Sequence, residues 1–350
     1  MRSGNLNAYS GMSTKLRAMK SQLISTSQYE EISRLPNVAE LIKFLQELPS
    51  YALVLSDIDA SSAHRGAIES RMTFSTYHDF FRIYQFGGKS QKKYLQYFFM
   101  QYEVNILKTC LRNILDSRPG LEPILIDDHF RRHSKLDIDN ITTTEDIDEF
   151  LNYLKDSLYG PCLFKVAEME KPTLFDYEIS LDLFFFDYTW KHKSHFVPKS
   201  EQGIYEKLLG YQIDLLNILW IYRCKKYYNT TESQVYSYLI NAYYKVKKNE
   251  IKKLVECDDD AFFEILKNTF YGRKYGFDTE KPMEMQFGYI VNDIYRKVFK
   301  ECPYTIASIN AYFRLKDIEV QKVVTALECI RYGYSSDQIM KYINEKGGAL

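Results

Sequence analysis

The sequence has few residues that interrupt helices, since its 350 residues include only 9 prolines and 15 glycines. So few breakers favour long helices over a sandwich or barrel with many turns. The chain also lacks a surplus of charge, because 46 basic residues balance 46 acidic ones. This balance argues against the broad positive field of a non-specific nucleic-acid binder. Hydrophobic residues make up 45% of the chain, which excludes a disordered protein.

Paired cysteines and long apolar runs are absent as well. The six cysteines lie far apart and form no CxxC pair, which disfavours a disulfide framework or a structural zinc site. No apolar run follows a basic segment at the start, so we expect no signal peptide. The longest apolar stretch, 211–222, contains Asp214 and Asn217 and is shorter than the ~20 residues of a transmembrane helix. We therefore expect a soluble, cytoplasmic protein that reaches a membrane only through a partner.

Aromatic residues, by contrast, are abundant at 15% of the chain, and some of them mark an internal repeat. The segment LKDSLYG, which contains Tyr159, matches the segment LKNTFYG, which contains Tyr271. A weaker copy, FLQELPSY, ends at Tyr51 and is one residue longer. In each copy a short amphipathic helix is expected to run into the tyrosine. The expected N-caps of these helices are Asn37, Thr144 and Asp258.

Two further landmarks recur in the same order with a period of about 110 residues. The first is a glutamate that heads an aromatic-rich stretch and is expected at a helix start, where a carboxylate interacts well with the helix dipole. These glutamates are Glu69, Glu178 and Glu284. The second is an apolar helix that follows 103–107, 217–219 or 319–321 and reaches an arginine. These arginines are Arg112, Arg223 and Arg331.

The repeat predicts an all-α chain of three related helical units, residues 1–115, 116–228 and 229–350. The segment 116–140, with its prolines, is the expected first linker, and a polar helix start at 229–232 marks the second. Such units, in a closed arrangement, would form a ring or funnel.

Motifs that carry chemistry are largely missing. The sequence contains no GxxxxGK[ST] or GxGxxG loop for phosphates and no GxSxG nucleophile elbow. Two histidine pairs, His129/His133 and His192/His195, have the spacing to share a helix face and hold a metal. Basic neighbours make a bound cation costly, so we interpret them as solvated surface histidines in loops. A stand-alone helical enzyme with a site near these pairs is the alternative to a protein without catalysis.

Charged and aromatic clusters also have structural interpretations. Asp258–Asp260 fits a helix N-terminus better than a metal site, and Asp127–Asp128 is the other acidic cluster. The basic run 245–253 has apolar residues at helical spacing, which favours a solvated helix face over a nucleic-acid or lipid site. The tyrosines follow the helical and repeat periods, so packing between helices explains them more simply than base stacking. We expect no cofactor and no metal.

Three segments resemble the C subunit of V-type (A/V-type) ATP synthases, a relative of the d subunit of eukaryotic V-ATPases. The stretch YSGMSTKLRAMKSQLI, residues 9–24, is similar to the opening of that family. The stretch from Val38 to Tyr51 resembles the next segment, and EVQKVVTALECIRYG, residues 319–333, resembles the C-terminal helix. Lys15 and Gln22 stand where the family often has arginine, and Ser50 where threonine is common.

The resemblance covers essentially the whole chain and implies a fold and a role. It implies three helical domains in a pseudo-threefold funnel on the cytoplasmic face of the membrane rotor (proteolipid) ring, with the central stalk in its mouth. It implies a peripheral, non-catalytic subunit that transmits rotation between the ATP-hydrolysing head and the ion-translocating ring. It implies neither bound nucleotide nor catalytic residues, and we expect a monomer when the chain is isolated.

Overall fold

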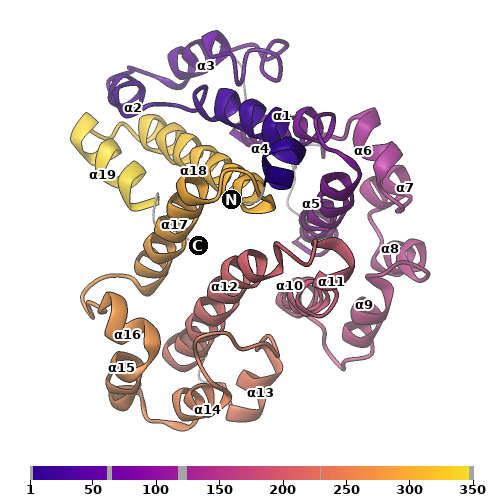
Figure 1. Cartoon of the computed structure of the whole chain (residues 1–350), viewed down its shortest axis with the longest axis vertical. Coiled ribbons are helices and arrows are strands. Elements are labelled where there is room, and N and C mark those ends of the chain that lie inside the picture. The colour runs from indigo at the N-terminus through magenta and orange to yellow at the C-terminus, as the bar shows by residue number, and fades with distance from the viewer. Residues whose placement is uncertain (1–2, 61–64, 117–123, 229, 347–350) are drawn as a thin grey trace. The chain divides into compact units, whose positions relative to one another are not determined.

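Every regular element that the structure describes is a helix (Figure 1). The computed structural model describes residues 3–60, 65–116, 124–228 and 230–346. The longest helices, α5 and α18, have 28 and 26 residues, as the scarcity of glycine and proline predicts. This confirms the all-α class. The chain forms two compact units, the first of Met1–Gln91 with Phe277–Leu350 and the second of Lys92–Gly276.

The first unit combines both ends of the chain. Its helices are α1 (Ser3–Lys20), α2 (Thr26–Ile32), α3 (Val38–Glu47), α4 (Arg65–Tyr84), α17 (Met283–Glu301), α18 (Ile306–Arg331) and α19 (Ser336–Lys346). Helix α18 contacts α1, α3, α4, α17 and α19. The expected apolar face of α3 is present, since Leu41 and Leu45 are buried. They share one core with Leu327 of α18 and Ile343 of α19. The two chain ends therefore build a single hydrophobic core.

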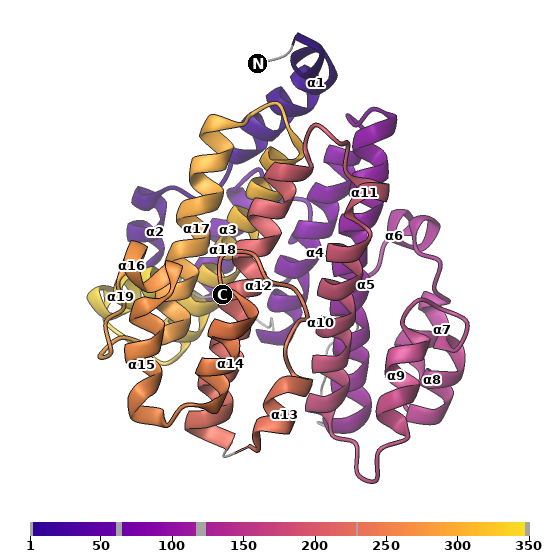
Figure 2. The same cartoon turned by 60° about the horizontal axis from the view of Figure 1, so that its bottom comes forward.

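The second unit contains three long helices, each followed by shorter ones. The long helices are α5 (Lys89–Asp116), α10 (Leu174–Lys191) and α12 (Gln202–Arg223), and Figure 2 shows them side by side. After α5 come α6 (Asp128–His133), α7 (Ile138–Thr143), α8 (Ile147–Leu154) and α9 (Gly160–Ala167). After α10 comes α11 (Lys193–Phe196). After α12 come the π-helix η1 (Cys224–Tyr228), α13 (Glu232–Ser237), α14 (Lys248–Glu256), α15 (Asp259–Asn268) and α16 (Phe270–Tyr275).

The expected helix starts are met in two of the three repeat copies. Asn37 caps α3 by accepting the Glu40 N–H at 3.0 Å. Asp258 stands at the N-cap position of α15, although its side chain makes no capping hydrogen bond. The prediction of Thr144 is wrong, because α8 begins two residues later and Asp146 is its cap. Thr144 instead ends α7 and donates its hydroxyl to Glu149 at 2.6 Å.

Three segments that are ambiguous in the sequence have clear structures. Residues 183–186 lie inside α10, as the repeat predicts. Residues 248–253 of the basic run lie in α14, with Ile251 buried. The expected linker 116–140 contains α6 and the start of α7, and its residues 117–123 lie outside the described residues. Across the described part of the chain, no helix combines the length and the apolar character that a membrane crossing requires.

Candidate functional site: three tyrosine–carboxylate clasps

The three repeated tyrosines lie in closely similar environments. Tyr51, Tyr159 and Tyr271 follow the ends of α3, α8 and α15, and each is at most 1% exposed. Tyr51 lies in the turn region after α3, Tyr159 is the N-cap residue of α9, and Tyr271 is the second residue of α16. A buried tyrosine hydroxyl needs a hydrogen-bond partner, because leaving it unpaired costs about 1–3 kcal/mol.

Each hydroxyl finds that partner in a buried carboxylate on a long helix. Tyr159 donates to Glu103 Oε2 of α5 at 2.8 Å, across 56 residues of sequence. Tyr271 donates to Asp214 Oδ2 of α12 at 3.0 Å, across 57 residues.

The third pair joins distant parts of the chain. Tyr51 donates to Glu319 Oε1 of α18, and 268 residues separate the two. We refer to the pairs Tyr51–Glu319, Tyr159–Glu103 and Tyr271–Asp214 as the clasps. The first clasp ties an N-terminal turn to the C-terminal part of the chain within the first unit.

The same carboxylates also hold the segments that lead into the short helices. Glu319 Oε2 accepts the Ile24 N–H at 2.5 Å, just before α2. Glu103 Oε1 accepts the Ser134 hydroxyl at 2.6 Å, just before α7. Each carboxylate therefore fixes both the entrance and the exit of a short-helix segment.

Among the three clasp carboxylates, Asp214 holds the segment before a short helix with the largest number of hydrogen-bond donors. It accepts the backbone N–H groups of Tyr244, Lys245 and Val246 at 3.0, 2.6 and 3.0 Å, just before α14. These three donors come from consecutive residues, so the carboxylate orders a stretch of backbone that has no helix of its own. The hydroxyl of Tyr271 adds the fourth contact.

Burial dominates the electrostatics of the clasps. It raises the pKa of the Glu103 carboxyl, and the hydrogen bonds from Ser134 and Tyr159 only partly oppose this effect. Burial likewise raises the pKa of Asp214 against its three backbone donors. Burial and then the facing carboxylate raise the pKa of Tyr159 and of Tyr271. Each phenol therefore stays protonated and keeps donating at physiological pH.

The clasp of the first unit carries an additional charge. Lys316 lies one turn before Glu319, is fully buried, and donates to Glu319 Oε1 at 3.0 Å. Its ammonium group lies 3.8 Å from the ring centroid of Tyr51, in cation–π geometry. In the Asp214 clasp, the residue one turn before the carboxylate is Tyr211, whose ring meets that of Tyr271 edge-on at 5.6 Å. The two clasps thus fill corresponding positions with different chemistry.

Glycine is required after Tyr159 and after Tyr271, because backbone carbonyl oxygens of the preceding short helix lie very close to that position. A Cβ at Gly160 would lie 2.6 Å from the carbonyl oxygens of Leu154 and Lys155. A Cβ at Gly272 would lie 2.2 Å from the Leu266 oxygen. This contact explains the Tyr-Gly pair in the two stronger repeats.

The glutamate landmarks do not belong to the clasps. Glu284 lies in the first turn of α17, as expected of a helix start. The expectation is wrong for Glu69 and Glu178, which are the fifth residues of α4 and α10. Glu178 instead forms an ion pair with Arg112 of α5, with Nε and Oε1 2.6 Å apart.

In each histidine pair, one imidazole nitrogen lies close to a backbone carbonyl oxygen one helical turn earlier. His133 lies in α6, and its Nδ1 is 2.8 Å from the His129 carbonyl oxygen. His192 ends α10, and its Nδ1 is 2.9 Å from the Tyr188 oxygen. The expectation of loops is therefore wrong for His129 and His133 in α6 and for His195 in α11. Within the described residues, no group of three histidine, cysteine or acidic side chains is placed to hold a metal ion.

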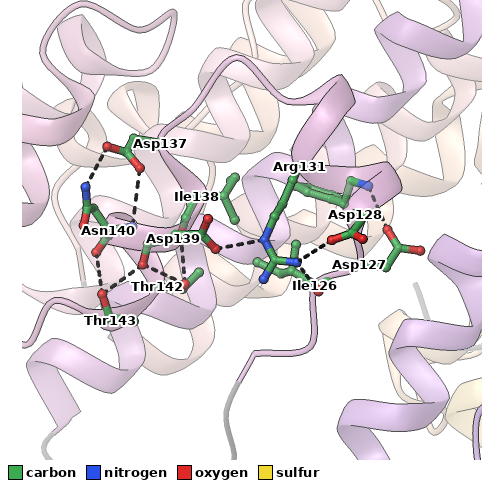
Figure 3. A network of polar contacts seen from close by, with 11 residues as sticks. Ile126, Asp127, Asp128, Arg131, Asp137, Ile138, Asp139, Asn140, Thr142 and Thr143 are labelled. Carbon is green, nitrogen blue, oxygen red and sulfur yellow. Dashed lines mark hydrogen bonds and ion pairs between the residues drawn. The ribbon is translucent and has the colours of Figure 1, made fainter.

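The acidic cluster beside the first histidine pair caps and links helices. Asp127 caps α6 by accepting the Phe130 N–H at 2.7 Å. Figure 3 shows Arg131 between Asp128, which also lies in α6, and Asp139, which lies in α7. The Nε atom of Arg131 is 2.9 Å from Oδ1 of Asp139. These charges are solvent-accessible and orient two short helices.

The internal repeat does not identify the three clasp carboxylates as one set. Glu103 and Glu319 begin two of the repeat landmarks, whereas the third landmark falls on Asn217 rather than on Asp214. Asn217 is itself buried and exchanges two hydrogen bonds with the Ile240 backbone. The signal available in the sequence is an acidic residue inside an apolar helix, which requires buried partners.

Comparisons with known proteins identify the family. No curated protein matches the chain. The family model described as ATP synthase (C/AC39) subunit matches residues 12–342. The match spans nearly the whole chain, including all six clasp residues, and agrees with the resemblance to the C subunit of V-type ATP synthases. The chain therefore belongs to the ATP synthase (C/AC39) subunit family.

Proposed function

We propose that this chain is a non-catalytic coupling subunit that links the central stalk of a V-type ATP synthase or ATPase to its membrane rotor ring. The observation that carries the proposal is the family match over residues 12–342. In this role the chain transmits rotation between the ATP-hydrolysing head and the ion-translocating ring. It is a peripheral protein on the cytoplasmic face of the membrane and a monomer when isolated.

The clasps suit a part that carries torque. Torque transfer needs a body that does not deform under load, and close-packed protein interiors resist deformation. Each clasp joins a long helix to both ends of a short-helix segment through buried, charge-assisted hydrogen bonds, which are among the stronger ones. The aromatic rings around them add dense packing, such as Tyr211 against Tyr271.

We further propose that the clasps mark three related units, 1–115, 116–228 and 229–350, arranged as a pseudo-threefold funnel. The similar surroundings of Tyr51, Tyr159 and Tyr271 support this division. The third unit would supply Glu319 to the tyrosine of the first. An experimental structure of the assembled complex tests this by superposition. Units that fail to superpose after rotations of about 120° would contradict the funnel.

Reconstitution tests the coupling role. A tagged chain, mixed with purified rotor ring and central-stalk subunits, should retain both at once on an affinity column. A complex that lacks the chain should lose coupling between head and ring, while the isolated head still hydrolyses ATP. Full coupling without the chain, or tight binding of ATP to the isolated chain in calorimetry, would contradict the proposal.

A further inference from the structure

A group of four basic side chains in the first unit has no acidic partner among the residues that the structure describes. It consists of Lys20 at the end of α1, Arg296 and Lys300 of α17, and Lys322 of α18, and we refer to it as the basic patch. Figures 1 and 2 show α1, α17 and α18 side by side, and α18 contacts both other helices. Arg296 and Lys300 are four residues apart, so they lie on one face of α17. Both are exposed.

Ring contacts bring the members of the patch together. The ammonium group of Lys20 lies 4.3 Å from the ring centroid of Phe299, the neighbour of Lys300 in α17. The ammonium group of Lys322 lies 5.1 Å from the ring centroid of Tyr29 in α2. Both lysines are half-buried, and these contacts restrict their side chains.

The charges of the patch repel one another. Burial and then the nearby Lys300 and Arg296 lower the pKa of Lys20. Burial and then Arg296 lower the pKa of Lys322. In the part of the chain that the structure describes, none of the four forms an ion pair with a carboxylate.

Several other exposed lysines of the chain are paired with carboxylates. Lys297, next to Arg296 in sequence, pairs with Asp293 at 2.6 Å, and Lys191 pairs with Asp187 at 2.7 Å. A chain of zero net charge thus balances many surface cations locally and leaves this group unbalanced. An unbalanced group of cations favours an anionic partner.

We propose that the basic patch docks an acidic segment of the central-stalk subunits of the ATPase complex. This inference rests on the proposed function and gives the charge chemistry of one contact. The patch extends over three helices with two exposed members, which suits an extended polypeptide. A membrane surface is less well matched, because interfacial sites present exposed aromatic rings, whereas Phe299 and Tyr29 are buried.

Charge reversal with a matched control tests the docking. Lys300→Glu and Arg296→Glu should each weaken binding to the purified central-stalk subunits by about tenfold, mainly through slower association. Lys297→Glu makes the same charge change on α17 outside the patch and should alter the affinity less than twofold. Raising the salt concentration from about 0.05 to about 0.3 M should weaken stalk binding by the unmodified chain more than stalk binding by the Lys300→Glu variant. Salt screens the attraction between the patch and its partner, and the variant has already lost part of that attraction. A zero-length carbodiimide reagent, which joins lysine amines to carboxylates, should link Lys20, Lys300 or Lys322 to an acidic residue of the partner.

The possible results separate this inference from the proposed function. Normal stalk binding by both patch variants, Lys300→Glu and Arg296→Glu, would overturn the inference and leave the coupling role intact. Failure of the unmodified chain to bind stalk or ring would overturn both. Co-flotation with phosphatidylserine-containing vesicles that Lys300→Glu abolishes, together with unchanged stalk binding, would assign the patch to lipid and overturn the proposal.

Discussion

At the scale of residues, the clasps differ in how well their carboxylates are satisfied. Asp214 accepts three backbone N–H groups besides the tyrosine hydroxyl. Glu103 has one donor fewer, since it accepts from the hydroxyls of Ser134 and Tyr159 and from the backbone of Lys135. A buried acceptor that loses a donor costs the most when few others remain. The same substitution should therefore have unequal effects in the two clasps.

We predict that Tyr159→Phe lowers the free energy of unfolding by about 1–3 kcal/mol and Tyr271→Phe by about 1 kcal/mol. The ring and its packing remain, so the difference reports the hydroxyl. Urea unfolding followed by circular dichroism measures both. Tyr332→Phe serves as the control, because Tyr332 is 70% exposed, and it should change stability by less than about 0.5 kcal/mol. Equal effects of all three substitutions would mean that the clasps do not stabilise the fold.

At the scale of elements, a turn after a short helix must pass close to the backbone of that helix. Gly160 and Gly272 permit this passage because they lack a Cβ. Gly203 offers a comparison in the first turn of α12, where a Cβ would meet nothing within 4 Å.

Gly160→Ala and Gly272→Ala should each destabilise the protein by about 1–3 kcal/mol, because backbone atoms must move to admit the methyl group. Gly203→Ala should be neutral or stabilise by up to about 1 kcal/mol, since alanine favours helix. Thermal melting of the three variants under identical conditions makes the comparison. If the Gly160→Ala and Gly203→Ala variants had the same melting temperature, the inferred close approach of backbone atoms to Gly160 would be wrong.

Helix α18 also carries a carboxyl group with a strongly shifted pKa. Burial raises the pKa of Asp317 from 3.8 to about 6, although Arg314 and Lys316 oppose the shift. The neighbouring Tyr77 also faces this carboxylate. The folded state therefore binds the proton more tightly than the unfolded state. The contribution of Asp317 to stability is complete below pH 3.8 and is lost as the pH rises through about 6.

Asp317→Asn should remove this part of the pH dependence. Between about pH 4 and pH 6, the urea midpoint of the unmodified protein should fall relative to that of the variant. The quantity to compare is the slope of the urea midpoint against pH, because the absolute stability of the variant also reflects the lost charge beside Arg314. Asp293→Asn, a substitution at a half-exposed site on α17, should keep the slope. Parallel pH profiles for Asp317→Asn and the unmodified protein would refute the assignment.

Local patterns predict the elements and the tyrosines, but not their partners. The apolar spacing of α3 and the repeat around Tyr159 and Tyr271 depend on nearby residues, so they are visible in the sequence. The cap of α8 is mispredicted because Thr144 and Asp146 are both good capping residues. The role of Asp214 is hidden in the sequence because its backbone donors lie 30 or more residues away, and only the folded chain brings them together.

At the scale of the whole molecule, the two units differ in how the chain supplies them. The second unit is continuous from Lys92 to Gly276 and contains two complete clasps. The first unit is assembled from both ends of the chain. Its core joins Ile32 and Leu41 to Leu327 and Ile343, and its clasp joins Tyr51 to Glu319. Neither end alone can bury this core.

We therefore predict that a fragment of residues 92–276 folds by itself, whereas residues 1–91 and 277–350 fold only when mixed. Circular dichroism and cooperative urea unfolding should detect helix formation on mixing, and size-exclusion chromatography should detect the complex. Tyr51→Phe combined with Glu319→Gln should weaken association of the two end fragments by about tenfold or more, because the clasp crosses between them. Ser56→Ala combined with Thr325→Ser changes polar groups outside the clasp on the same two fragments and should weaken association much less. Cooperative unfolding of residues 1–91 alone would show that this end of the chain has its own core, and the mutual dependence of the two ends would then be wrong.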